Sequence, residues 1–243
     1  MLRAVLSDVH SNLEALEAVL ADVARSGATE LLCLGDFVGY GASPNECLDR
    51  LRPLLTAAVV GNHDVAVCGR SRLGDFTSNA AQAARWTGTV LSPENQAWLE
   101  SLPYTLRHGG ALLVHASPAE PRAWRYVLSL EEARVEFDGF EDDLCLIGHS
   151  HYPGAFRLDG RTGELVYGRE AEVALAAGSR FLVNVPSVGQ PRDGDARAGY
   201  LLWDDEAGRV RHVRVGYDVA GARQRILDAG LPRFLGERLQ WGE

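Results

Sequence analysis

The sequence predicts an α/β fold in which two sheets pack face to face and helices cover their outer sides. In the first half of the chain, short apolar runs alternate with segments of helical periodicity, which is typical of a mostly parallel sheet. In the second half, short strand patterns are separated by glycine- and aspartate-containing turns, which indicates antiparallel pairs. No linker-like stretch divides the 243 residues, so we expect a single domain over residues 1–243.

Apolar runs and helix signals place the elements of the first half. Strands are expected at residues 2–6, 31–34, 57–60, 104–107, 111–114 and 144–147. Helices are expected at residues 13–23, 44–51, 76–100 in two segments, and 129–137. Ser11 and Glu14 have the spacing of a capping box for the first helix, and Pro44 stands at the favoured first position of the second.

The second half is expected to build the other sheet. Strand patterns occupy residues 153–168, 180–185 and 200–215, and terminal helices are expected within residues 218–238. The clearest turns are Asp159-Gly160 and Glu206-Ala207-Gly208. Short strands joined by such turns favour antiparallel pairing, in contrast to the first half.

Composition restricts the class of protein and its partners. The apolar fraction of 46% and the charged fraction of 23% are typical of a soluble globular protein. The formal net charge of -9 argues against broad attraction to nucleic acid. No apolar stretch could span a bilayer, and the first residues turn polar too early for a signal peptide. We therefore expect a cytoplasmic location and no membrane partner, while nothing in the sequence sets an oligomeric state.

The cysteines do not suggest a disulfide framework. The four cysteines, Cys33, Cys47, Cys68 and Cys145, form no Cys-x-x-Cys pair. Two of them lie within apolar strand runs, where a free thiol behaves as a small hydrophobic side chain. We therefore expect neither disulfides nor a thiolate zinc site.

Five of the predicted strands are followed directly by Asp, Asn or His. The segments are Ser7-Asp8-Val9-His10, Gly35-Asp36, Gly61-Asn62-His63-Asp64, His115 and Gly148-His149-Ser150-His151. These side chains bind hard-to-borderline divalent metals. In open α/β sheets, sites form outside the carboxyl ends of the strands. The sequence therefore predicts that five strand ends converge on one metal centre.

Each segment has a plainer explanation when it is taken alone. A helix cap, a buried histidine and a strand-to-turn carboxylate explain the first two segments better than a metal does. An αL turn explains the asparagine of the third equally well, and a buried hydrogen-bonded ring explains the lone histidine. Only the last segment, with two histidines two residues apart after a glycine, is hard to explain by packing, and there the odds are even.

Taken together, the five segments favour two metal ions. They supply two Asp, one Asn and four His as candidate ligands. That set exceeds the about four to six ligands of one ion but suits two ions that share a bridging carboxylate. Two carboxylates against two divalent cations leave a positive centre, which matches a phosphate ester and a bridging hydroxide. His63 is then free to face the substrate, with Asp64 fixing its tautomer.

In this order, the five segments resemble the motifs of the calcineurin-like metallophosphoesterase superfamily, and residues 7–16 most resemble its small bacterial phosphodiesterase branch. The resemblance implies a four-layer α/β-β/α sandwich of two mixed sheets flanked by helices. It also implies two ligand sets that share one carboxylate: Asp8, His10, Asp36 and His151 for one ion, and Asp36, Asn62, His115 and His149 for the other.

The chain departs from the Ser/Thr protein phosphatase branch of that family. That branch carries an Arg soon after the bridging Asp and a Glu after the metal-site Asn-His pair. Here Asp36 is followed by Phe37-Val38-Gly39-Tyr40-Gly41, and His63 is followed by Asp64. The phosphate-clamping Arg is therefore missing from its usual place, which disfavours protein phosphatase activity.

We therefore expect hydrolysis of a small phosphate ester, with a phosphodiester ahead of a phosphomonoester. A hydroxide that bridges the metals attacks phosphorus in line, and His63 protonates the leaving oxygen. Mixed nitrogen and oxygen ligands suit Mn, Fe, Zn, Co or Ni, of which Mn is expected first. The alternatives are a metal-binding interaction module without hydrolysis and a nuclease, which the acidic composition disfavours.

The rim of the predicted site is less defined. Asn12 stands at a helix start whose amides could face phosphate, although ordinary helix initiation explains it better. In the loop after His115, Arg122 and Arg125 could hold a phosphate while Trp124 stacks on a base, although a solvent-exposed loop is the simpler explanation. A second rim would be formed by Gln190 and Arg192.

Overall fold

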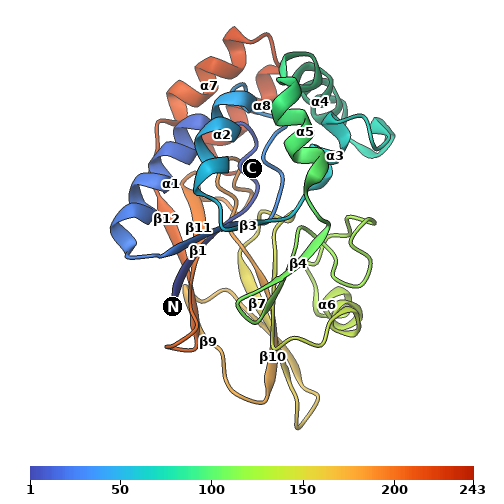
Figure 1. The fold of residues 1–243 in the computed structure, drawn as a ribbon, viewed down its shortest axis with the longest axis vertical. Helices are drawn as coiled ribbons and strands as arrows, with labels where there is room; N and C mark the ends of the chain where they lie inside the picture. Colours follow the sequence, from blue (N-terminus) through green and yellow to red (C-terminus); the bar gives the residue numbers. More distant parts are fainter.

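Two mixed sheets of six strands each form the centre of the computed structural model, which describes residues 1–243 (Figure 1). The first sheet has the order β3 (Ala57–Ala58), β2 (Glu30–Cys33), β1 (Leu2–Leu6), β11 (Ala198–Asp204), β12 (Arg209–Val215) and β9 (Glu172–Ala174). The second has the order β4 (Thr105–His108), β5 (Ala111–Val114), β6 (Leu144–Ile147), β10 (Ser179–Asn184), β7 (Gly154–Asp159) and β8 (Leu165–Gly168). Buried apolar side chains of both sheets, among them Val5, Leu113 and Phe181, form one cluster between them.

Helices cover the outer faces of both sheets, so the fold has the four predicted layers (Figure 1). The helices are α1 (Leu13–Ser26), α2 (Pro44–Leu51), α3 (Asn62–Val67), α4 (Ser78–Val90), α5 (Pro93–Ser101), α6 (Leu130–Glu136), α7 (Val219–Asp228) and α8 (Arg233–Glu237). Outside the first sheet, Leu16 of α1 and Leu48 of α2 share a buried cluster with Leu6 of β1. Outside the second sheet, Ala133 of α6 shares a cluster with Ile147 of β6. The predicted fold class is confirmed.

The strands that precede the predicted ligands run parallel within their sheets. In the first sheet β1, β2 and β3 are parallel, and in the second β5, β6 and β10 are parallel. The carboxyl ends of parallel strands meet at one edge of a sheet. The segments after β1, β2, β3, β5 and β6 are consequently brought to one end of the sandwich.

The partition of strands between the sheets differs from the sequence prediction. The second half of the chain does not build a sheet of its own, because β11, β12 and β9 extend the first sheet. In turn, β4, β5 and β6 from the first half form one side of the second sheet. The cause is β11, which pairs antiparallel with β1 along Leu2 to Val5 and so returns the chain to its first strand.

Several local features also differ. The strand expected at 57–60 is shorter in the structure, where β3 covers only Ala57–Ala58. The Val60 amide donates to the Pro103 carbonyl and does not continue the pairing with β2. Helix α1 is capped by Asn12, whose Oδ1 accepts from the Ala15 amide, and not by Ser11. The short elements α3 and β9 were not predicted, because six- and three-residue segments carry too little periodicity.

Two further expectations concern disulfide bonds and membrane-spanning helices. All four cysteines are free, and only Cys68 is even partly exposed. None of the helices combines the length and the apolarity that crossing a membrane requires.

Candidate metal centre

The structure brings all seven predicted metal ligands together at the carboxyl ends of β1, β2, β3, β5 and β6. Their ligand atoms form neighbouring groups in which the atoms lie within 4.8 Å of one another. One group contains Asp8, His10 and His151, and a second contains Asp36, His115 and His149. The Asn62 Oδ1 joins the second group at 3.2 Å from the His115 Nε2.

Three of the histidine rings are oriented by backbone carbonyls. The Nδ1 atoms of His10, His115 and His151 lie at hydrogen-bond distance from the carbonyls of Val38, Leu34 and Gln190, respectively. A carbonyl can only accept, so each Nδ1 carries a proton and donates it. The Nε2 of each ring therefore faces the centre of the site, and this is the arrangement in which histidine binds metal.

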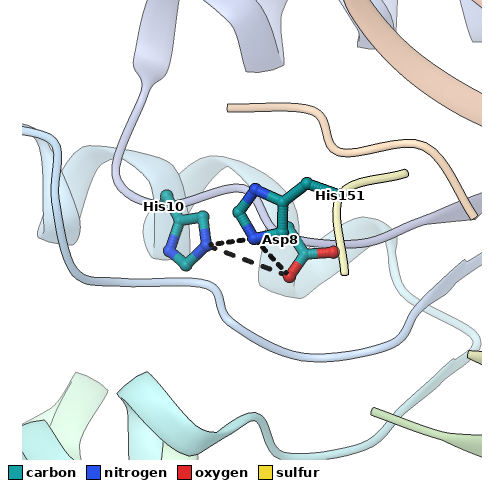
Figure 2. A group of neighbouring side chains, drawn as sticks. All are labelled: Asp8, His10 and His151. Atoms are coloured by element: carbon teal, nitrogen blue, oxygen red, sulfur yellow. Dashed lines mark hydrogen bonds and ion pairs between the residues drawn. The ribbon is translucent and has the colours of Figure 1, made fainter. Parts of the chain in front are cut away.

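The inward-facing atoms of the first group are all acceptors, and only the Asp8 carboxylate has a donor, the His149 amide at 3.2 Å. Figure 2 shows the rings of His10 and His151 directed toward each other and toward the Asp8 carboxylate. The two Nε2 atoms are 3.2 Å apart. The His151 Nε2 also lies 3.2 Å from the Asp8 Oδ1. Burial lowers the pKa of both rings and so favours their neutral forms, in which the two Nε2 lone pairs oppose each other. A cation bound among these three atoms removes that repulsion, so the donor set fits a metal ion.

Asp36 lies between the two groups. Its Oδ2 is 3.7 Å from the His10 Nε2 in one group and 3.3 Å from the His115 Nε2 in the other. Its Oδ1 accepts from the His63 amide at 2.8 Å, which fixes the carboxylate. In the second group, the buried His149 Nε2 has no hydrogen-bond partner. A carboxylate placed between two acceptor groups is suited to bridge two ions.

The ligand positions have an unusual backbone conformation. Five of the seven, Asp8, His10, Asp36, His149 and His151, have φ between +47° and +62°. This left-handed region is uncommon for residues other than glycine and costs free energy. Neighbouring glycines permit the close packing around them: a Cβ on Gly61 would lie 2.1 Å from the Asp36 Oδ1. The local strain is therefore concentrated where the strand ends must turn side chains toward one point.

Buried charges in the site are mutually compensated. Burial would raise the pKa of the Asp8 and Asp36 carboxyls, but the surrounding histidines hold both below the usual range. Burial alone would lower the pKa of His115, but the negative charges of Asp36 and Asp8 outweigh the effect of burial and raise this pKa to about 9. A proton on His115 therefore offsets part of the carboxylate charge, and a bound cation would displace it.

His63 lies beside the two groups, at the start of α3. Its ring is 4.9 Å from the His10 ring and packs against Tyr40 at 4.4 Å and Phe76 at 4.8 Å. A Cβ on Gly39 would lie 2.5 Å from the His63 Nδ1, so only glycine leaves room for the ring. The Nδ1 is buried without a partner, and burial lowers the pKa of His63 to about 4.

The predicted contact between Asp64 and His63 is absent. The Asp64 Oδ2 accepts from the amides of Asp36 and Gly61, both at 2.9 Å, and its Oδ1 accepts from the Val38 amide at 3.2 Å. Successive residues on a helix point in different directions, so Asp64 turns into the protein while His63 faces the pocket. The prediction that Asp64 fixes the His63 tautomer is wrong. Asp64 instead connects the segments after β2 and β3 through these hydrogen bonds.

Replacing Asp64 with Asn is expected to lower the free energy of unfolding by about 1–3 kcal/mol, because the new amide group would face backbone N–H donors in a buried site. Urea denaturation of the metal-free protein measures the change, with Asp75→Asn on the exposed surface as the control. Equal stability of the two variants would show that the three amides do not depend on the Asp64 carboxylate.

One cavity of about 400 Å³ opens over the metal-ligand groups. Arg122, Trp124 and Arg192 line it, as predicted for the rim. Arg125 does not line it, because its guanidinium turns outward to pair with Glu120.

Two other predicted rim residues have structural contacts instead. Asn12 lies outside the cavity, since its Oδ1 caps α1 and its Nδ2 donates to the Gly189 carbonyl at 2.9 Å. Gln190 is buried behind the rim, and its Oε1 accepts from Arg192 at 2.9 Å. The structure therefore assigns Asn12 to helix initiation.

Sequence reasoning missed part of the cavity wall. Tyr40, Phe76 and Tyr126 line the cavity, and the Tyr126 ring stacks on His149 at 4.2 Å. The sequence does contain a signal for Tyr40, because a residue only four positions after Asp36 is expected to lie near the site. Phe76 and Tyr126 belong to irregular segments whose path a sequence pattern does not reveal.

Comparisons with known proteins agree with this geometry. The family model described as the calcineurin-like phosphoesterase superfamily domain matches residues 1–207. An uncharacterized protein of Methanocaldococcus jannaschii is 41% identical over 243 residues, covering 98% of this chain and 97% of that protein. The crystal structure of a metallophosphoesterase from Sphaerobacter thermophilus is similar, with a TM-score of 0.89, 38% identity and coverage of 100% of this chain and 99% of that chain.

A hypothetical protein from Pyrococcus horikoshii OT3 has the same fold, with a TM-score of 0.79, 20% identity and coverage of 100% of this chain and 98% of that chain. The family match spans most of the chain, and the relative from Methanocaldococcus jannaschii is similar along nearly its whole length. The chain therefore belongs to the calcineurin-like phosphoesterase superfamily.

Proposed function

We propose that this protein hydrolyses a small phosphate ester at two divalent metal ions, with phosphodiesters ahead of phosphomonoesters. The observation that carries the proposal is the convergence of seven metal-binding side chains on a cavity that also holds His63. The first ion would be held by Asp8, His10, Asp36 and His151, and the second by Asp36, Asn62, His115 and His149. Mn²⁺ is the first candidate, and Fe, Zn, Co and Ni fit the same donors.

The ions would supply an activated water at neutral pH and neutralise charge on the phosphoryl oxygens. The transfer of a proton to the leaving oxygen is left to a side chain of the protein. His63 is placed to donate a proton to the leaving oxygen, because its ring lines the cavity next to Asp36 and its Nδ1 is free of protein partners. The ring is neutral in the free protein, and an anionic phosphoryl group bound beside it raises its proton affinity.

The size of the cavity favours a small substrate. Its volume of about 400 Å³ is at the lower end of the range for ligand sites, about 300–1,000 Å³. Aromatic rings of Tyr40, Phe76, Trp124 and Tyr126 form much of its wall. Such a cavity is suited to a phosphate ester with a compact organic group.

Hydrolysis of bis-p-nitrophenyl phosphate and p-nitrophenyl phosphate in the presence of Mn²⁺ tests the proposal. We expect release of p-nitrophenol from both, faster from the diester, and no release after chelation of the metal. The same assays with Fe²⁺, Zn²⁺, Co²⁺ and Ni²⁺ rank the ions. Inactivity with all five metals on both esters would contradict the proposal and favour a metal-binding module without hydrolysis.

A further inference from the structure

The guanidinium of Arg192 reaches the cavity without a carboxylate partner. Its Nη2 donates to the Gln190 Oε1 at 2.9 Å and to the Tyr40 hydroxyl at 3.3 Å, and both acceptors are neutral. Its Nε is buried and has no hydrogen-bond partner at all. No carboxylate oxygen lies within 4.0 Å of it, since none of the ion pairs in the structure involves this residue.

Two other largely buried arginines, Arg3 and Arg214, are paired with carboxylates, whereas Arg180 and Arg223, whose Nε atoms are also buried without a partner, are not. Arg3 contacts Glu30 at 2.6 Å and Asp205 at 2.8 Å, and Arg214 contacts Asp193. A buried charge without a counter-charge is costly, and of these residues Arg192 alone lines the cavity, where a ligand could supply the counter-charge. The unpaired Arg192 therefore indicates that an anion is its intended partner.

The position of Arg192 connects this anion to the metal centre. Arg192 lines the same cavity as Asn62, His63 and His149. His151 lines it too, and Gln190 contacts both residues, because its carbonyl accepts from the His151 Nδ1 and its Oε1 accepts from Arg192. Binding of divalent cations would add positive charge next to Arg192, and an anionic ligand relieves that repulsion.

Tyr40 holds the guanidinium in this position. The Arg192 Cζ lies 5.7 Å from the centre of the Tyr40 ring, and the same ring packs against His10 at 4.6 Å and His63 at 4.4 Å. The segment after Asp36 carries no cationic side chain of its own, since it reads Phe37-Val38-Gly39-Tyr40-Gly41. Tyr40 thus connects the loop after Asp36 with Arg192, which is distant in sequence.

We propose that Arg192 binds an oxygen of the substrate's phosphoryl group, and of the phosphoryl group in the product, with Tyr40 and Gln190 as the groups that position it. The inference rests on the proposed function for the identity of the substrate. The chemistry on which it depends is the charge-assisted hydrogen bond between a planar guanidinium and a phosphate oxyanion.

The test compares Arg192→Met and Arg192→Lys with the wild type, and uses Arg238→Met as the matched control. Arg238 donates to the same Gln190 Oε1 at 3.3 Å but does not line the cavity. Calorimetric titration of the Mn²⁺-loaded proteins with inorganic phosphate gives the dissociation constant, and elemental analysis gives the metal content. We expect Arg192→Met to weaken phosphate binding by about ten- to a hundredfold with unchanged metal content, and Arg192→Lys to restore part of the affinity.

The outcomes separate this inference from the proposed function. Phosphate affinity in Arg192→Met equal to that of the wild type, or loss of metal from that variant, would overturn the role of Arg192. An Arg192-dependent affinity for phosphate in a wild-type protein that hydrolyses no ester would support the anion site and contradict the hydrolytic function. A Tyr40→Phe variant that keeps metal but binds phosphate more weakly supports the positioning part of the proposal.

Discussion

Replacement of Asp36 by Asn is expected to reduce kcat for ester hydrolysis by about a thousandfold or more. The carboxylate lies within 3.7 Å of histidine nitrogens from both ligand groups, so it can serve both ions at once. An amide is uncharged, and with its oxygen at the His63 amide its N–H donors would be directed at both groups. The loss of several kcal/mol of metal-dependent stabilisation corresponds to about three orders of magnitude in rate.

Elemental analysis and steady-state assays of the same preparations check this prediction. We expect Asp36→Asn to bind fewer than two ions per chain, while Asp138→Asn, which changes an exposed carboxylate outside the cavity, keeps both the metal and the rate. Circular dichroism confirms that each variant is folded. A variant at Asp36 with two ions and full activity would remove the bridging role.

Replacement of His63 by Ala is expected to lower kcat by about a hundred- to ten-thousandfold while both ions remain bound. The neutral ring lines the cavity beside Asp36 without a protein partner at Nδ1. The loss should be larger for an ester with an alkoxide leaving group than for one that releases p-nitrophenol, because p-nitrophenol leaves readily without a proton. Rates for both kinds of ester, measured on metal-loaded protein, provide the comparison.

Metal content decides between two roles for His63. Its ligand atom also lies within 4.8 Å of those of His10 and Asp36, so a role as an additional ligand is the competing interpretation. Loss of an ion from His63→Ala would support that interpretation and contradict proton donation. The control is His108→Ala, which removes a partly exposed histidine bonded to Glu30 at 3.1 Å and outside the cavity.

The positions of the metal-binding residues could be predicted because they depend on local rules. A residue directly after a parallel strand must lie at the carboxyl edge of its sheet, and this places Asp8, Asp36 and His115 close together once the strands are recognised. The direction of each side chain needed the structure. Asp64 follows His63 directly, yet it points the other way, because a helix begins between the strand end and this pair.

The sheet partition and the cavity wall depend on contacts that are distant in sequence. Nothing local distinguishes β11 as a partner of β1 from a member of a separate antiparallel sheet, since both choices bury the same apolar face. Tyr126 reaches His149 through an irregular loop, and Arg192 reaches Tyr40 from a position 152 residues away. Such contacts arise from the packing of the complete chain.

The pairing of β1 with β11 has a consequence for the order of events during synthesis. The Asp8 carbonyl accepts from the Gly189 amide at 2.8 Å and the Ser187 hydroxyl at 3.0 Å, so the first ligand segment is held by residues made much later. Pairings of such long sequence separation form slowly and only after the intervening chain exists. The first ligand segment therefore cannot be held in place before residues 187–189 have been made, so we expect the site to become competent for metal only late in translation or after it.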